Sequence, residues 1–235
     1  MIKILDLCSG TQSVKIAYPK CDYKGLDIYQ PDNNDNIIFD LSQDNIIEKI
    51  KNLLGNWKPD FIWASPLCTP FSRATCIPGG SLSYELKNDR CVIRDNFEII
   101  KHKAYLKHVT NLDFQKKHKD KGVLGLKLLG NIKEIISYYN VPFVIENPST
   151  ALSKYELTCY SRNITAYCMY GFLYKKSTAI YSNKVLNLKK CNHKNHIQVM
   201  SGWTKKTGIE NAPSSNKDRS KVPPKLIKEI ISQFN

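Results

Sequence analysis

The sequence lacks an apolar run of membrane-spanning length, and its 235 residues show no cysteine framework. The opening stretch from Met1 to Asp6 is too short and too soon acidic for a secretory signal. We therefore expect an intracellular protein with no membrane partner. In a reducing compartment its eight cysteines should be thiols rather than disulfides. These absences argue against a membrane protein and against a small disulfide-stabilised secreted domain.

Acidic residues are scarce in the second part of the chain, where most of the formal net charge of +14 arises. Residues up to Ser72 include 7 Lys and Arg and 9 Asp and Glu. Because the whole chain has 35 Lys and Arg and 21 Asp and Glu, the residues after Ser72 include 28 Lys and Arg and 12 Asp and Glu. Such an asymmetry is expected where a small-molecule site and a polyanion-binding surface share one chain. An AT-rich genome, which favours Lys, Asn and Ile codons, is an alternative source of part of the excess.

An apolar run of strand length, Phe61 to Ala64, leads into a turn that presents Cys68. The strand should end there, because Pro66 cannot continue a central β-ladder. In open α/β sheets ligands bind at the carboxyl ends of the strands. Cys68 is therefore a candidate reactive thiol, and the alternative is a buried small hydrophobic side chain.

Three acids, Asp6, Asp27 and Asp40, stand at the ends of three successive predicted strands. After the first strand, a small polar turn from Cys8 to Ser13 opens a helix, which lets backbone N–H groups approach an anionic or polar ligand. A carboxylate about twenty residues beyond such a turn suits a ribose diol. The pattern predicts an α/β sheet with a nucleoside-cofactor site at one edge.

The remaining apolar patterns predict further elements. They are a helix over Asn45–Leu54 closed by Gly55, an amphipathic helix over Leu124–Tyr139, a strand over Phe143–Ile145, a strand pair within Tyr170–Tyr181, and a closing helix over Ile227–Phe234 that is entered at Pro223-Pro224.

The order of these motifs resembles the DNA (cytosine-5) methyltransferase family, in particular its compact phage and viral members. The resemblance spans nearly the whole chain. The matching stretches are Asp6-Leu7-Cys8-Ser9-Gly10, Asp27, Asp40, Ser65-Pro66-Leu67-Cys68-Thr69-Pro70-Phe71-Ser72, Glu146-Asn147-Pro148, Tyr170-Gly171-Phe172-Leu173-Tyr174-Lys175-Lys176 and Val222-Pro223-Pro224-Lys225-Leu226.

The resemblance implies a doubly wound, Rossmann-like α/β sheet with a small target-recognition insertion. It assigns residues 1–181 and 219–235 to a catalytic domain and residues 182–218 to a small basic target-recognition segment. Residues 73–122 match the catalytic loop of the family and should form a long basic loop or insertion, with a solvated basic surface as the alternative. The implied partner is double-stranded DNA rather than RNA, bound by a monomer.

The implied chemistry depends on a thiol and a carboxyl. Because cytosine C5 is too weak a nucleophile to accept a methyl group directly, the cysteine thiolate of the family first adds to C6. Cys68 matches this nucleophile, and Glu146 matches the carboxyl that acts at N3 of the ring. A structural carboxylate is the alternative role for Glu146. The target base must also be flipped out of the duplex.

The other matched positions divide into two sets. By resemblance, S-adenosyl-L-methionine should contact Leu7, Cys8, Ser9, Gly10, Thr11, Gln12, Asp27, Ile28, Asp40, Leu41 and Ser65. The substrate should contact Ser72, Arg73, Asn147, Lys176 and Thr178.

Four places depart from the family pattern. Gln12 stands where a second glycine is expected, and Leu67 replaces a proline. Lys176 and Thr178 take the places of two arginines, and Arg219-Ser220-Lys221 replaces Gly-Asn-Ala. Neither the nucleophile nor the acid is lost. These departures leave two alternatives open, the same reaction on RNA or a methyltransferase-like module that binds DNA or cofactor without turnover.

Cys191, His193 and His196 form a compact cluster of metal-ligand types. With Cys159 or Cys168 as a fourth ligand they could hold zinc. The spacing matches no zinc template, however, and on that ground the sequence predicts no metal.

The lysines of the second part should contact phosphates rather than base edges, because a flexible ammonium is a point charge. The set comprises Lys116, Lys117, Lys119, Lys121, Lys189, Lys190, Lys205 and Lys206.

Overall fold

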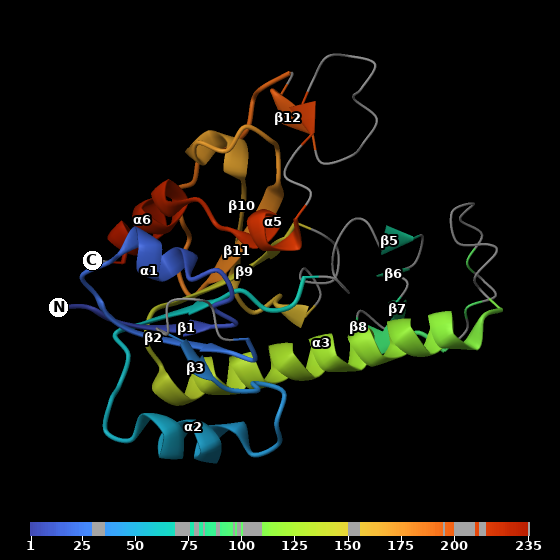
Figure 1. Ribbon diagram of the computed structural model, residues 1–235, viewed down its shortest axis with the longest axis horizontal. Coiled ribbons are helices and arrows are strands. Elements are labelled where there is room, and N and C mark those ends of the chain that lie inside the picture. Colours follow the sequence, from blue (N-terminus) through green and yellow to red (C-terminus); the bar gives the residue numbers. More distant parts are fainter. Residues whose placement is uncertain are drawn as a thin grey trace.

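A seven-stranded sheet forms the centre of the protein in the computed structural model (Figure 1). The structure describes residues 1–29, 36–68, 76–77, 80–81, 83–87, 90–95, 97, 100, 110–149, 156–194, 196–199, 210–211 and 215–234. Across the sheet the strands run in the order β10-β11-β9-β4-β1-β2-β3. Their bounds are Lys3–Leu7 for β1, Asp22–Asp27 for β2, Asn36–Ile38 for β3, Phe61–Ala64 for β4, Phe143–Pro148 for β9, Ser161–Ala166 for β10 and Ser177–Ser182 for β11.

The strands from β9 to β3 pair in parallel, and β11 runs antiparallel between β9 and β10. Strand β1 lies between β2 and β4, so the chain builds the sheet outward on both sides of its first strand. In open α/β sheets such a switch point is where ligands bind, beyond the carboxyl ends of the strands. The topology confirms the doubly wound, Rossmann-like methyltransferase sheet that the sequence predicts.

The central strands are apolar on both faces because helices cover both faces of the sheet (Figure 1). Along β1, Leu5 and Leu7 face the core beneath α2 and α3, whereas Ile4 faces the core beneath α1 and α6. Burying an aliphatic side chain of this size contributes about 1.5–3 kcal/mol relative to exposure. The helix bounds are Ser13–Ala17 for α1, Ile46–Leu54 for α2, Leu112–Tyr139 for α3 and Pro224–Ser232 for α6.

Several predicted elements are found with nearly their predicted bounds. Strand β4 covers the predicted residues, and helix α2 ends at Gly55, which adopts a φ of 54°. A positive φ suits glycine because it has no Cβ. Helix α6 follows Pro223 and has Pro224 in its first turn, as the proline pair predicts.

Within residues 73–122, predicted as a long loop or insertion, the described residues include regular structure. Four short strands form an antiparallel sheet in the order β5-β6-β7-β8, with bounds Cys76–Ile77, Gly80–Ser81, Tyr84–Lys87 and Arg90–Ile93. Helix α3 then begins at Leu112, twelve residues before the predicted start, so the lysine run Lys116–Lys121 is helical.

The early start of α3 has a local cause. The side chain of Asn111 accepts a hydrogen bond from the backbone N–H of Phe114 at 2.9 Å and caps the helix. The first half of the helix packs against the small sheet, where a Cβ on Gly122 would lie 2.7 Å from the carbonyl oxygen of Ser83. Apolar residues therefore follow the helical repeat only weakly in this first half of α3. No helix in the described part of the chain is both long and apolar enough to cross a membrane.

The predicted strand pair within residues 170–181 lies differently. Its second strand is β11, but its partner β10 precedes Tyr170, and η4 (Tyr167–Tyr170) is a 3₁₀ helix. Gly171 follows η4 with a φ of 99°. The short elements that remain are β12 (Gln198–Val199), β13 (Glu210–Asn211) and α5 (Asn216–Ser220).

Candidate active site

The register of the parallel strands places the predicted site residues at one edge of the sheet. Leu7 at the end of β1 pairs with Leu26 on one side and Ala64 on the other, and Ala64 in turn pairs with Ile145. The residues that follow these positions therefore emerge side by side. They are Cys8, Asp27, Ser65 and, in β9, Glu146.

Glu146 is buried and held by two hydroxyl groups. The phenol of Tyr167 donates to Oε1 at 2.8 Å, and the hydroxyl of Thr178 donates to the same oxygen at 2.5 Å. Thr178 is fully buried, and its hydroxyl oxygen also lies 3.0 Å from the carbonyl oxygen of Asn147. The threonine that replaces an arginine of the family therefore lies against the carboxylate and fixes its orientation.

Asn147 joins the glutamate strand to the turn that leads to the cysteine. Its Nδ2 donates to the carbonyl of Pro66 at 3.3 Å, while its buried Oδ1 has no hydrogen-bond partner among the described residues. Leu67 packs against the core beneath α2 and α3. A hydrogen bond and an apolar contact thus hold the turn in which Leu67 replaces the family's proline.

Cys68 is exposed at the end of this turn and lies within electrostatic range of Glu146 and Lys176. Desolvation by the surrounding protein atoms raises the pKa of the Cys68 thiol, and the charge of Glu146 adds to the rise. The ammonium of Lys176 opposes both effects and lowers the pKa. The arrangement brings together a thiol, a carboxyl and a cation.

Lys176 is itself held in place by the protein. Its Nζ donates to the carbonyl of Arg219 at 3.0 Å and lies 4.7 Å from the centre of the Tyr167 ring. Lys176 and Arg219 both depart from the family pattern, and they contact each other directly.

The turn after β1 docks on the end of β2 through Asp27. One carboxylate oxygen accepts from the backbone N–H of Gly10 at 2.9 Å, and the other accepts from Tyr29 at 3.0 Å. The backbone N–H of Ser9 donates to the carbonyl of Leu26 at 3.2 Å. Asp27 therefore fixes the turn as well as lying at the edge where a ribose is expected.

Gln12, which stands where the family has a second glycine, adopts a left-handed backbone conformation. Its φ is 53°, in the region where a non-glycine residue costs roughly 1–2 kcal/mol. Its buried side chain donates to Oδ1 of Asn36 at 2.9 Å, a contact that glycine cannot make. The hydrogen bond to Asn36 offsets part of the strain.

The other predicted cofactor residues differ in exposure. Ile28 is 54% exposed beside Asp27 and leaves an apolar surface at the edge. Asp40 is exposed, and its Oδ1 accepts from both the backbone N–H and the hydroxyl of Ser42. Leu41 is buried in the core, and the Ser65 hydroxyl accepts from the indole of Trp63 at 3.0 Å.

Asp6 lies buried beneath the turn rather than at the open edge. Its carboxyl accepts a hydrogen bond from the Tyr23 hydroxyl at 2.9 Å. Burial raises the pKa of Asp6 to about 8, although the bond from Tyr23 lowers it and the charge of Asp27 raises it further. This acid, one of three expected at strand ends, is therefore a neutral structural group near neutral pH.

Replacing Asp6 with Asn should remove a pH dependence of folding. Because the pKa of Asp6 is higher in the folded state than its ordinary value of 3.8, the folded protein binds the extra proton and loses stability as pH rises from about 4 to about 8. As pH rises across that range, the melting temperature of Asp6→Asn should therefore increase relative to that of the unmodified protein. Thermal unfolding at a series of pH values measures it, and a constant difference would contradict the assignment.

The last motif packs against the first. The backbone N–H of Val222 donates to the hydroxyl of Ser13 at 3.0 Å, and that hydroxyl also bonds with Thr11 at 2.9 Å. The polar turn is thus held by residues from both ends of the sequence. The predicted substrate contacts Ser72 and Arg73 and the phosphate contacts Lys205 and Lys206 lie outside the described residues.

Among the predicted phosphate contacts that the structure describes, Lys116, Lys117, Lys189 and Lys190 are exposed, and Lys119 and Lys121 are half-buried. Lys119 forms an ion pair with Asp95 at 3.1 Å, and Lys189 forms one with Glu229 at 3.7 Å. In these two pairs, the ammonium group of a predicted phosphate-binding lysine contacts a carboxylate of the protein itself.

Sequence reasoning missed Tyr167, which lies just before the Tyr170 motif. A buried tyrosine hydroxyl needs a hydrogen-bond partner, but the sequence does not indicate which residue provides it. Burial and the neighbouring charge of Glu146 raise the pKa of Tyr167 well above its ordinary value, so it is a hydrogen-bond donor throughout the physiological range.

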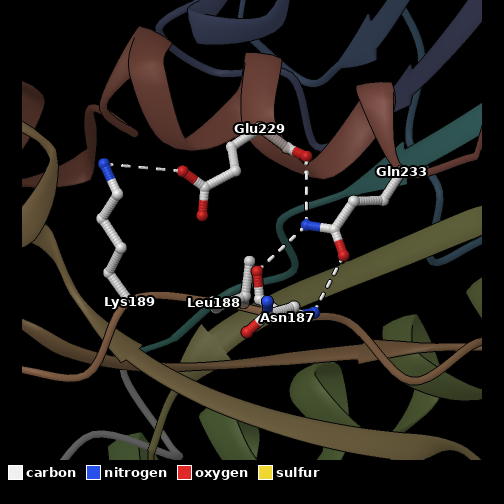
Figure 2. Close-up of a pocket in the computed structure, with 5 residues that line it drawn as sticks. All are labelled: Asn187, Leu188, Lys189, Glu229 and Gln233. Carbon is white, nitrogen blue, oxygen red and sulfur yellow. Dashed lines mark hydrogen bonds and ion pairs between the residues drawn. The ribbon is translucent and has the colours of Figure 1, made fainter.

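A groove of about 470 Å³ lies away from this edge, between α6 and the chain segment 187–189 (Figure 2). Its polar groups already bind one another. Gln233 bonds with Asn187 and with the carbonyl of Glu229, whose carboxylate pairs with Lys189. None of the five lining residues is a predicted catalytic or cofactor residue, and the bonds attach the segment to α6.

No protein-family model and no curated protein matches the chain. Solved structures that match include the Entamoeba histolytica methyltransferase EhMeth, with 12% identity and a TM-score of 0.47 over 83% of this chain and 57% of that chain. Schizosaccharomyces pombe Dnmt2 matches with 12% identity and a TM-score of 0.42 over 81% and 51%. A variant of Spodoptera frugiperda DNMT2 matches with 16% identity and a TM-score of 0.41 over 82% and 54%.

The chain spans about half of the length of these three structures. At such low identity and TM-score the likeness carries no conclusion about the activity of this chain. The resemblance of this chain to the DNA (cytosine-5) methyltransferases therefore rests on its own motifs and strand order.

Proposed function

We propose that the protein transfers a methyl group from S-adenosyl-L-methionine to C5 of cytosine in DNA, through a covalent intermediate between Cys68 and C6. The observation that carries the proposal is the placement of Cys68 and Glu146 at one sheet edge, within electrostatic range of each other and beside the turn after β1. A thiol next to an oriented carboxyl is what addition to a pyrimidine ring requires.

The residues at this edge would bind the methyl donor. In this proposal Asp27 binds the ribose hydroxyls, the exposed side chain of Ile28 packs on the adenine ring, and Asp40 binds the adenine amino group. The polar turn from Cys8 to Gln12 would hold the remainder. When bound, S-adenosyl-L-methionine supplies an electrophilic methyl group.

Cys68 must lose its proton before it can add to C6. Its raised pKa makes the thiolate scarce at neutral pH, and Lys176 is the cation that favours the thiolate form. Binding of substrate in the neighbouring space would bring the thiol and the ring together, so a small thiolate fraction is sufficient for addition. At the end of the reaction the C5 proton leaves to solvent, the C5=C6 bond forms again, the thiolate is expelled and the N3 proton returns to Glu146.

Glu146 has the geometry of a proton donor to N3. Both protein donors bind Oε1, and no described residue donates to Oε2. Oε2 is thus the oxygen that can carry a proton toward the ring. Proton donation at N3 neutralises the charge that builds on the pyrimidine when the thiolate adds.

The target base must leave the duplex to reach this edge, because C6 is otherwise covered by stacked neighbours. The exposed lysines at the start of α3 and in the segment after β11 are placed to bind the phosphates that flank an extruded base.

Incubation with radiolabelled S-adenosyl-L-methionine and either duplex DNA or RNA tests the proposal. Label in 5-methylcytosine of the DNA is the expected result. Label in RNA alone would show that the substrate is RNA rather than DNA. Cofactor binding without label in either polymer would identify a binding module without turnover.

Replacing Asp27 with Ala should weaken S-adenosyl-L-methionine binding at least tenfold. The substitution removes hydrogen bonds to a charged carboxylate, each worth about 1.5–3 kcal/mol, and releases the Gly10 turn. Isothermal titration calorimetry measures the change. Asp60→Ala is the matched control, because Asp60 holds the backbone N–H of Lys3 at 2.8 Å at the other end of the parallel strands. Equal affinities in the two variants would refute the role of Asp27.

A further inference from the structure

Four side chains with metal-ligand atoms converge beside the sheet, outside the site described above. The ligand atoms of Cys168, Cys191, His193 and His196 all lie within 4.8 Å of one another. Sγ of Cys191 is 3.4 Å from Sγ of Cys168, 3.3 Å from Nε2 of His196 and 4.0 Å from Nδ1 of His193.

The convergence joins two separate segments of the chain. Cys168 belongs to η4, whereas the other three residues belong to a stretch after β11 without helix or strand. Sequence spacing alone did not indicate a metal, because the fourth ligand lies 23 residues before Cys191. The fold selects Cys168 from the two cysteines that the sequence left open.

These separations fit one tetrahedral ion. With bonds of about 2.3 Å to sulfur and about 2.0–2.1 Å to nitrogen, tetrahedral geometry separates neighbouring ligand atoms by roughly 3.3–3.8 Å. The three measured separations lie close to this range. Two cysteines and two histidines are also a common ligand set of structural zinc sites.

We propose that Cys168, Cys191, His193 and His196 bind a structural zinc ion. The two thiolates balance the charge of Zn²⁺, and four protein ligands leave no open coordination position. The site is therefore structural rather than catalytic. The zinc site does not depend on the methyl-transfer activity proposed above.

A disulfide between Cys168 and Cys191 is the competing explanation for the short contact. A disulfide would need a sulfur separation of about 2.05 Å, far below the observed 3.4 Å. It would also give no reason for two histidines to surround the same sulfur atoms. The ligand set as a whole favours zinc.

The ion would anchor the predicted target-recognition segment next to the catalytic carboxyl. Residues before the cluster already attach there, because Thr165 donates to the carbonyl of Lys189 at 2.7 Å and the backbone N–H of Lys189 donates to Tyr170 at 3.0 Å. Cys168 directly follows Tyr167, which holds Glu146. Zinc would thus fix the start of the segment to the same 3₁₀ helix that orients the acid.

Metal analysis of the whole protein, purified without chelator, tests the site. We expect about one zinc per chain. The double variant Cys168→Ser/Cys191→Ser should lose the metal, and Cys159→Ser is the matched control because Cys159 is a free cysteine outside the cluster. Folded protein without zinc, or zinc retained by the double variant, would overturn the proposal.

Two measurements keep the test valid if the double variant fails to fold. Cobalt(II) added to the metal-free protein should give the visible absorption of a tetrahedral thiolate-imidazole site, and His193→Asn should weaken cobalt binding. Mass spectrometry without reductant should show both cysteines as thiols after metal removal under nitrogen. A spectrum of octahedral cobalt, or a Cys168–Cys191 disulfide in the native protein, would refute the zinc site.

Discussion

Replacing Cys68 with Ala should lower methyl transfer by roughly 10⁴-fold or more, the scale on which enzymes lose activity with their nucleophile. Without the thiol no covalent bond to C6 forms, and C5 stays too weak a nucleophile. Binding of S-adenosyl-L-methionine should change little, because the cofactor residues other than Ser65 lie on β1 and β2 and in the loops that follow β1, β2 and β3. Initial rates with labelled cofactor and calorimetric affinities measure both quantities.

The matched control is Cys159→Ala, because Cys159 and Cys68 are the two exposed cysteines among those whose burial the structure describes. That variant should methylate at the normal rate. DNA containing 5-fluorocytosine gives a positive test, since fluorine at C5 blocks proton loss and traps the adduct. Mass spectrometry should locate the adduct at Cys68, and normal turnover by Cys68→Ala would exclude this thiol as the nucleophile.

Replacing Glu146 with Gln should lower kcat by about 10²–10⁴-fold, the usual contribution of a positioned general acid. Glutamine keeps the volume and the Oε1 that accepts from Tyr167 and Thr178, so the fold should be retained. Its amide can donate a hydrogen bond to N3 but cannot transfer a proton. Single-turnover kinetics separate the chemical step from product release.

Tyr167→Phe provides the comparison for Glu146→Gln. It removes one bond to the carboxylate and leaves the acid, so the expected loss in kcat is about tenfold, corresponding to one hydrogen bond. Near-normal activity of Glu146→Gln together with a large loss in Tyr167→Phe would reverse the two roles.

The strands of the sheet could be predicted because buried parallel strands read as continuous apolar runs. Phe61–Ala64 and Phe143–Ile145 are such runs, and the residues that follow them are the proposed nucleophile turn and acid. The start of α3 could not be predicted in this way. Its first half covers only a small sheet, so few apolar residues mark the helix.

The partners of the site residues were less accessible to sequence reasoning. The bond from Tyr167 to Glu146 depends on the antiparallel insertion of β11 between β9 and β10, which no local pattern specifies. The same insertion places Thr178 opposite Pro148 and so beside the acid. The motif identified Thr178 as a site residue, but its hydrogen bond to Glu146 depends on the order of the strands.

The hydrogen bond from Val222 to Ser13 has a consequence for synthesis on the ribosome. It links residues 209 positions apart, and α6, which follows it, buries Leu226, Ile227, Ile230 and Ile231 in the core that it shares with α1 and the central strands. The cofactor turn therefore stays incomplete until α6 has left the exit tunnel. Because distant contacts form late and slowly, a nascent chain should not retain S-adenosyl-L-methionine before α6 has emerged.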